Sequence, residues 1–191
     1  MSRLRTALWL AAAAMVFGLS SITHGFAQAP APAPAQSADP FGQEVVLTAQ
    51  TIVHMKGTTT WDSAYETLVE AFKTVSGYLD RQGIKPSGPQ MTIYLSTDDS
   101  GFQFQAAVPI AEAPNEPPRG DIALGKSPEG KALKFIHRGS YDAMDTTYEA
   151  ITNYLDEKKL EAKELFVEQY ITDLRTTPED KLVIEVYVPL K

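Results

Sequence analysis

The chain has 191 residues, 43% hydrophobic and 21% charged, which is the composition of one ordinary globular domain. Its formal net charge of −7 gives no electrostatic basis for binding nucleic acid, so we expect no nucleic-acid partner. The sequence contains no cysteine, which excludes disulfides, thiol catalysis and thiolate–metal sites.

The N-terminal segment predicts export. Arg3 and Arg5 precede an apolar run over residues 7–19, and Gly25-Phe26-Ala27 is typical of a cleavage site. The apolar run is too short for a membrane-spanning helix. We therefore expect a signal peptide over 1–27, a periplasmic or secreted protein, and no stable membrane insertion after cleavage.

Residues 28–41 are rich in alanine and proline, which favours an extended linker. We place the domain at 42–191, with halves at about 44–110 and 131–191. Residues 111–130 contain four prolines and three glycines, and we predict that they form a connector between the halves.

In the first half, β-branched residues predict a strand over 44–55. Apolar residues at spacings of three and four then predict an amphipathic helix from Thr60 to Gly83, capped by Thr59 or Thr60. Strands are predicted at 91–96 and 102–109, separated by the turn sequence TDDSG.

The second half has the same order of elements. A strand is predicted at 132–137, followed by a helix with Ser140 or Asp142 as its cap. Strands at 164–172 and 182–189 follow, with a turn between them.

Similar residues recur in the two halves at intervals of 83, 76 and 80 positions. The pairs are His54 with His137, Tyr65 with Tyr148, Tyr94 with Tyr170, and Val108 with Val188. We interpret this as an internal duplication of a strand–helix–strand–strand unit. It predicts an α+β fold with an antiparallel sheet, two helices on one face and a central cleft.

Glu168 is the main candidate for a binding residue. Alternation along the strand places it on one face with Phe166 and Tyr170. Burying an unpaired acid is costly, and an acid between aromatic rings suits a cation with an apolar body. The alternative is that this face is solvated and Glu168 pairs with a lysine or arginine.

Other residues have weaker signals. Trp61 and Tyr65 lie on an apolar helical stripe but carry a polar tip, so they are candidates to line the cleft. His54 and His137 offer two imidazoles, but two ligands do not make a metal site; we expect them to satisfy backbone groups, and we expect no metal and no cofactor.

The sequence shows no established catalytic motif, neither a G-x-S-x-G nor a glycine-rich phosphate loop. Glu168 and Tyr170 would form an acid–base pair if burial raised the pKa of the acid. We leave the question of an enzyme open and favour a binding protein.

Four segments resemble the GyrI-like small-molecule-binding domain, which is also the effector-binding part of AraC-type and multidrug-binding MerR-type regulators. They read HRGSY at 137–141, EQYITD at 168–173, TTPE at 176–179 and VYVP at 186–189. The resemblance covers about residues 44–191. It implies a pseudo-symmetric α+β fold whose cleft binds bulky, often cationic, lipophilic molecules, with Glu168 as the charge partner and Tyr170 as the tyrosine of the E-x-Y strand. Some similar members hydrolyse reactive cyclopropane-bearing toxins.

The sequence therefore predicts an exported protein that captures a lipophilic cationic or aromatic compound. The expected ligand-binding residues are Glu168, Tyr170, Phe166, Trp61, Tyr65 and Tyr94. Two alternatives stay open: a hydrolase that uses Glu168 and Tyr170, and a structural or partner-binding module of the envelope.

Overall fold

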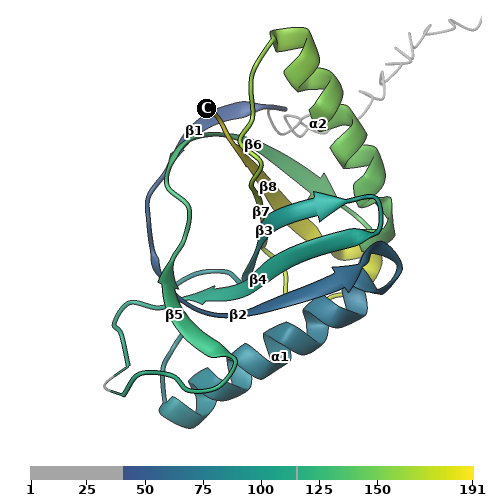
Figure 1. Ribbon diagram of the computed structural model, residues 1–191. Coiled ribbons are helices and arrows are strands. Elements are labelled where there is room, and N and C mark those ends of the chain that lie inside the picture. The colour runs from purple at the N-terminus through teal and green to yellow at the C-terminus, as the bar shows by residue number, and fades with distance from the viewer. Residues whose placement is uncertain (1–40, 115) are drawn as a thin grey trace, which may run out of the picture. The chain divides into compact units, whose positions relative to one another are not determined.

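The computed structural model describes residues 41–114 and 116–191; the predicted signal peptide and residues 28–40 lie outside this part. Eight strands of the described chain form one antiparallel sheet in the order β1-β6-β8-β7-β3-β4-β2-β5 (Figure 1). With its two α-helices, this is the predicted α+β architecture. In the described residues, no helix is long and apolar enough to cross a membrane.

The two halves contain the predicted series of elements. The first half consists of β2 (Thr51–Thr60), the 3-10 turn η1 (Trp61–Ser63), α1 (Ala64–Gln82), β3 (Met91–Asp98) and β4 (Gly101–Pro109). The second half consists of β6 (Gly130–Arg138), η2 (Tyr141–Ala143), α2 (Met144–Lys158), β7 (Phe166–Tyr170), η3 (Glu179–Lys181) and β8 (Val183–Pro189).

The two outer strands differ from the prediction. The single strand predicted over 44–55 is two strands, β1 (Gln43–Leu47) and β2, because residues 48–50 leave the sheet. β1 pairs with β6 of the second half. The predicted connector contains a further strand, β5 (Ile122–Lys126), which pairs with β2. Local patterning signals a strand but not its partner, so neither pairing was visible in the sequence.

The halves meet where β3 pairs with β7. Thr92 lies directly opposite Glu168 in this pairing, and these two residues are 76 positions apart, the same interval as Tyr94 and Tyr170. The pseudo-twofold axis therefore passes between Thr92 and Glu168.

The pairing of β2 with β4 and of β6 with β8 corrects the alignment of the histidines. Val53 pairs with Val108 in the first half and Leu133 with Val188 in the second, so both strands repeat at an interval of 80. His54 therefore corresponds to Lys134 and not to His137. The interval of 83 predicted from the histidine pair is wrong in these strands.

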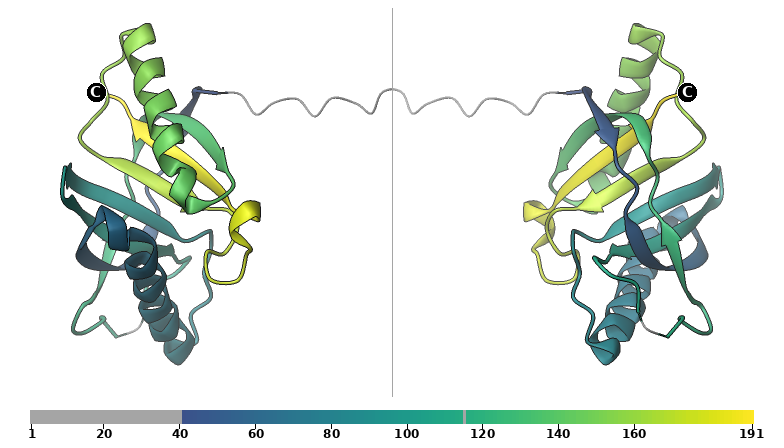
Figure 2. Two further views of the ribbon diagram at one scale, coloured as in Figure 1. Left: turned by 90° about the vertical axis from the view of Figure 1, so that its right-hand side faces the viewer. Right: turned by 90° about the vertical axis from the view of Figure 1, so that its left-hand side faces the viewer.

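Both helices cover the same face of the sheet (Figure 2, left). The apolar stripe predicted for α1 is buried at Leu68, Phe72, Val75 and Leu79, whereas Trp61 at its start is 44% exposed. Burying each of the large side chains contributes roughly 1.5–3 kcal/mol to folding. This packing fixes α1 against the sheet.

Both helical segments start at a predicted cap residue, and one of these residues forms the capping hydrogen bond. The Ser140 hydroxyl accepts a hydrogen bond from the Asp142 N–H at 3.3 Å, as predicted. Thr60 precedes η1 but makes no such bond, and the Thr59 hydroxyl contacts that of Thr67 at 3.0 Å instead. Thr60 thus occupies the predicted N-cap position of the first helical segment, but without a capping hydrogen bond.

The second face of the sheet is crossed by residues 48–50 and 127–129, which we call the crossing segments (Figure 2, right). The Gln50 N–H donates to the Ser127 hydroxyl at 2.9 Å, and the Ser127 N–H donates to the Gln50 carbonyl at 3.0 Å. These two bonds clamp the segments together. Beneath them lies a small apolar cluster that includes Met91 and Val167.

Candidate functional site

A cavity of about 420 Å³ opens between the two halves on the helix-covered face. The starts of both helical segments and strands β3 and β7 contribute its lining, so it is the predicted central cleft. The lining residues are Trp61, Asp62, Ala64, Tyr94, Tyr141, Asp142, Met144, Asp145, Tyr148 and Glu168.

Glu168 is the polar centre of this cavity, with only 1% of its surface exposed. Tyr148 donates to its Oε1 atom at 2.7 Å. Tyr170 and Tyr141 donate to its Oε2 atom at 2.8 and 3.3 Å. Three tyrosines from three different elements therefore hold one carboxylate.

A second layer of hydroxyls supports the first. Because Tyr170 and Tyr141 give their protons to Glu168, their own oxygens accept from further groups. The Thr92 hydroxyl lies 2.8 Å from Tyr170, and the Tyr94 hydroxyl lies 3.0 Å from Tyr141. The network therefore directs every donor towards Glu168, which favours a carboxylate at its centre.

Burial acts in the opposite direction on this acid. Desolvation raises the pKa of Glu168, although the hydrogen bonds from Tyr148, Tyr170 and Tyr141 oppose the shift. These groups are neutral, and burial together with the nearby Glu168 charge raises their own pKa values well above 10. The carboxylate is thus solvated by hydroxyls without a cation among them, and a positive charge delivered to the cavity would stabilise its ionised form.

Aromatic rings surround the acid. Tyr94 stacks on Phe166 with a centroid separation of 4.2 Å, and Tyr148 meets Phe166 edge-on at 5.2 Å. Trp61 packs on Phe102 at 4.8 Å, and its indole N–H donates to the Asp98 carbonyl at 2.8 Å. Trp61 is thereby fixed at the cavity wall while remaining partly exposed.

The pseudo-symmetry breaks at the centre. The counterpart of Glu168 is Thr92, which is fully buried and bonds to Tyr170. The two halves therefore contribute an acid and a hydroxyl at equivalent positions, so Glu168 has no buried carboxylate opposite it.

Three exposed acids form the rim of the cavity: Asp62, Asp142 and Asp145. Each lies in the first turn of a helical segment, where a negative side chain is favoured by the unpaired N–H groups. Together with Glu168, they give the cavity a negative field that would attract cations.

The structure places the predicted site residues in three groups. Glu168, Tyr94 and Trp61 line the cavity. Tyr170 and Phe166 lie behind the lining and hold Glu168 and Tyr94 in place. As ligand contacts, all of them remain predictions.

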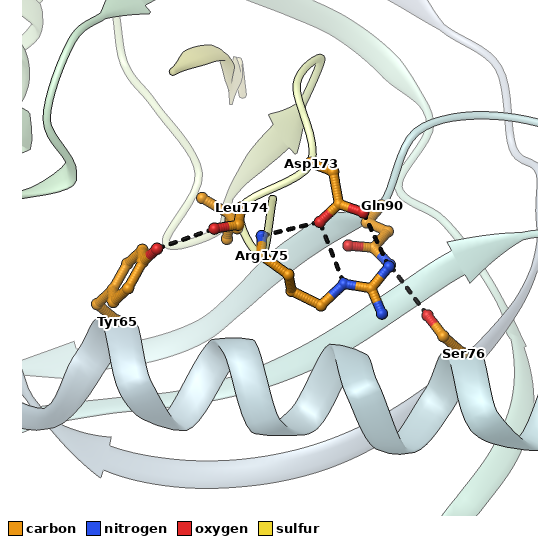
Figure 3. A network of polar contacts seen from close by, with 6 residues as sticks. All are labelled: Tyr65, Ser76, Gln90, Asp173, Leu174 and Arg175. Carbon is orange, nitrogen blue, oxygen red and sulfur yellow. Dashed lines mark hydrogen bonds and ion pairs between the residues drawn. The ribbon is translucent and has the colours of Figure 1, made fainter. Parts of the chain in front are cut away.

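Tyr65 lies apart from these residues. Its hydroxyl donates to the Leu174 carbonyl at 2.8 Å, so it fastens the loop after β7 to α1 (Figure 3). In the same loop Arg175 pairs with Asp173 at 2.8 Å. Tyr65 also meets the ring of Tyr141 at 5.7 Å, which makes it a supporting residue.

Sequence reasoning missed Tyr141 and Tyr148 as partners of Glu168, and it missed Asp142 and Asp145 as acids of the cavity rim. One signal was present, because Tyr141 closes the HRGSY segment. The repeat gives no second signal: α1 and α2 begin 80 positions apart, so Tyr148 does not correspond to Tyr65 as the interval of 83 had indicated. The HRGSY segment does not reveal that the Tyr141 and Tyr148 hydroxyls reach the same carboxylate.

The histidines do not form a joint site. His137 contacts the Thr147 hydroxyl at 2.7 Å and the Ser140 carbonyl at 3.0 Å, which is the predicted role at a strand–helix junction. His54 pairs with Ala107, a member of the apolar cluster on the opposite face, and its buried Nδ1 has no partner in the described residues. Burial and nearby Lys56 lower the pKa of His54. Among the described residues, no three potential metal-binding side chains gather.

Comparison with known structures supports this fold. The chain superposes on EcmrR in a complex with DNA at a TM-score of 0.68 with 13% identity, covering 78% of this chain and 57% of that one. It thus spans just over half the length of EcmrR. The EcmrR C-terminal domain alone gives a TM-score of 0.65 with 14% identity and 98% coverage of that domain.

Two further structures share the fold. SAV2435 bound to tetraphenylphosphonium has a TM-score of 0.56 and 17% identity, covering 78% of this chain and 93% of that one. A hydrolase from Listeria innocua has a TM-score of 0.54 and 10% identity, covering 79% and 92%. At these identities the likeness shows the fold alone. No curated protein matches the sequence.

The family model of the GyrI-like small molecule binding domain matches residues 43–191, which include every strand and helix described above and the whole tyrosine–glutamate cavity. The chain therefore belongs to the GyrI-like family of small-molecule-binding domains.

Proposed function

We propose that this protein is exported and captures an amphiphilic cation in the cavity around Glu168. The observation that carries the proposal is a buried carboxylate at the base of an open cavity, whose hydrogen-bond donors within residues 41–114 and 116–191 are all neutral hydroxyls. A cation with an apolar body would supply the missing positive charge and cover the surrounding rings.

The energetics favour a cation over a neutral ligand. A charge placed over an aromatic face gains about 0.5–2 kcal/mol, depending on its desolvation. Tyr94, Tyr148 and Trp61 offer such faces in the lining. The acidic rim adds attraction during approach, which chiefly increases the association rate.

The structure of SAV2435 with tetraphenylphosphonium supports the choice of ligand, because that protein shares the fold and its ligand is a lipophilic cation. The hydrolase alternative draws on the direct contact between Tyr170 and Glu168. It has less support, because Tyr170 donates its proton to Glu168, lies behind the cavity lining and has a raised pKa. Tyr170 is therefore poorly placed to remove a proton from a substrate.

Glu168→Gln tests the proposal with a matched pair of ligands: cationic tetraphenylphosphonium and neutral triphenylphosphine oxide. The substitution keeps the shape of the side chain and removes its charge. We expect calorimetry to show cation affinity falling about 10- to 100-fold, or about 1.4–2.7 kcal/mol, because the Coulomb attraction between the carboxylate and the shielded cation is lost. Affinity for the neutral compound should change little.

The control is Glu164→Gln, which removes an exposed acid just before the same strand. It should leave both affinities unchanged. Equal loss of both ligands in Glu168→Gln would contradict a charge-based site. Turnover of a reactive lipophilic ester by the wild type, lost in Glu168→Gln with binding retained, would support the hydrolase instead.

The proposal of export depends on the predicted signal peptide. N-terminal sequencing of the protein recovered from the periplasm or the medium of its producing cells should begin at Gln28. Recovery of the intact N-terminus from the cytoplasm alone would contradict export.

A further inference from the structure

A second cavity of about 320 Å³ lies on the opposite face of the sheet, beneath the crossing segments. Strand β1 forms one wall through Val45 and Leu47, and Met91 and Val167 provide an apolar floor from β3 and β7. Met91 and Val167 are each only 4% exposed. The two cavities are therefore separated by the central strands of the sheet.

The shape of this second cavity is set before any ligand binds. Its roof includes Gln50 and Ser127, which exchange the two hydrogen bonds that clamp the crossing segments. Because each segment is only three residues long between paired strands, the roof has little freedom. At 320 Å³, the cavity has the size of a site for a small organic molecule.

Three polar side chains lie in the lining of this cavity: Lys134, Tyr187 and Gln169. Lys134 forms an ion pair with Glu185 at 3.2 Å, and Tyr187 donates to the other oxygen of Glu185. The side-chain amide of Gln169, half-buried in the lining, has no hydrogen-bond partner in the described residues. An amide of this kind offers both a donor and an acceptor.

The charges in this cavity cancel. Lys134 and Glu185 are 22% and 18% exposed, so their pair is largely withdrawn from solvent and screened little by salt. An ammonium ligand would be repelled by Lys134 in the lining, and a carboxylate ligand would have to compete with Glu185 for Lys134. A neutral head that accepts and donates hydrogen bonds meets neither penalty and satisfies Gln169.

From these observations we propose a second ligand site for an uncharged amphiphile with an amide-like head and an aliphatic tail. The head binds Gln169 beside the Lys134–Glu185 pair, and the tail packs on Met91, Val167 and Val45. The two faces of the sheet thus select ligands by charge: a cation at Glu168 and a neutral molecule at Gln169.

Two methionines report on the two sites separately, because Met91 lines the second cavity and Met144 lines the first. The full chain is labelled with methyl-¹³C methionine, and its methyl signals are followed by NMR. The probes are octanamide, octanoate and octylammonium, which share one tail and differ in head charge. Tetraphenylphosphonium serves as the probe of the Glu168 cavity.

We expect octanamide to shift the Met91 signal saturably and more strongly than either charged analogue. Gln169→Leu should weaken octanamide about fivefold, the loss expected for one neutral hydrogen bond. Val45→Trp, which fills the cavity from the edge strand, should abolish the Met91 shift. Both variants should retain the response of Met144 to tetraphenylphosphonium.

Three results would overturn the second site: no Met91 shift with octanamide, an octanamide effect on Met144 alone, or equal Met91 shifts with all three heads. An unchanged octanamide affinity in Gln169→Leu would overturn the assigned head group. Because Met144 is read in the same spectra, failure of the cation site is seen independently of these outcomes.

Discussion

Two features of its surroundings act in opposite directions on the protonation of Glu168. Tyrosine hydroxyls favour its ionised form, and burial favours its neutral form. Burial prevails, so the pKa of Glu168 is raised above its ordinary value of 4.5. An acid held in this way costs the free protein stability at neutral pH, and a cationic ligand would remove part of that cost.

The sign of this effect can be tested by unfolding. Between pH 4.5 and the higher pKa of the folded state, folded Glu168 holds a proton that the unfolded chain has lost. Wild-type stability therefore falls as pH rises through this window, by up to about 1.4 kcal/mol for each unit of pKa difference. Glu168→Gln lacks this titration.

We expect the melting temperature of Glu168→Gln, relative to that of the wild type, to increase from pH 4 to pH 8. Below pH 4.5 the acid is neutral in both states, and the difference should become constant. Glu164→Gln is the control for loss of an exposed acid and should show no such trend. A difference that is the same at every pH would show that Glu168 has an ordinary pKa.

At the scale of the elements, the two helices end in the same way with different residues. Gly83 and Lys159, 76 positions apart, both adopt left-handed backbone with φ of 67° and 54°. In each case the next residue donates back into the last turn, Ile84 to Leu79 and Leu160 to Leu155. This termination suits glycine, because a Cβ atom is strained in left-handed backbone.

Substitutions at Gly83 and Lys159 should have opposite effects on the free energy of unfolding. Gly83→Ala should destabilise the protein by about 1 kcal/mol, since its Cβ meets open space and only the backbone conformation is affected. Lys159→Gly should stabilise it by about 0.5–1 kcal/mol. Urea denaturation measures both changes.

Lys159→Ala separates backbone strain from the loss of charge, because alanine keeps the Cβ atom. It should leave the unfolding free energy within about 0.5 kcal/mol of the wild type. If Lys159→Ala stabilised the protein as much as Lys159→Gly, the lysine charge rather than the left-handed backbone would be responsible.

At the scale of the whole domain, the two halves cannot separate without breaking strand pairs. β1 precedes the first half in the sequence but pairs with β6 of the second half. β5 follows the first half in the sequence and pairs with β2 of that half. The crossing segments that connect these strands are clamped by Gln50 and Ser127. The domain should therefore unfold as one cooperative unit despite its internal duplication.

Ser127→Ala tests the clamp. The substitution leaves the Gln50 N–H without its acceptor and should lower the unfolding free energy by about 1–3 kcal/mol, with a single transition retained. Ser87→Ala, at an exposed hydroxyl, is the control and should be near neutral. A biphasic melt of the wild type would contradict the interlocked arrangement.

The sequence by itself determined what depends on local pattern. The spacing of Leu68, Phe72, Val75 and Leu79 specifies a helix and its buried face, because only a helical period brings them together. The alternation around Glu168 places the acid beside aromatic rings on the helix-covered face. The recurring tyrosines indicated a duplicated fold with a cleft between its halves.

Only the tertiary structure decided what depends on pairing between distant segments. The partner of each outer strand follows from strand pairing, which local pattern does not encode. The same is true of the interval of 80 between the halves, which aligns His54 with Lys134 and not with His137. Two of the tyrosines that donate to Glu168, Tyr141 and Tyr148, lie at the start of the second helical segment. They precede Glu168 on its strand by 20 or more residues in the sequence. The hydroxyl network arises from packing of η2 and α2 on β7 within the second half, because these hydroxyls reach one carboxylate only after the sheet and the helix have assembled.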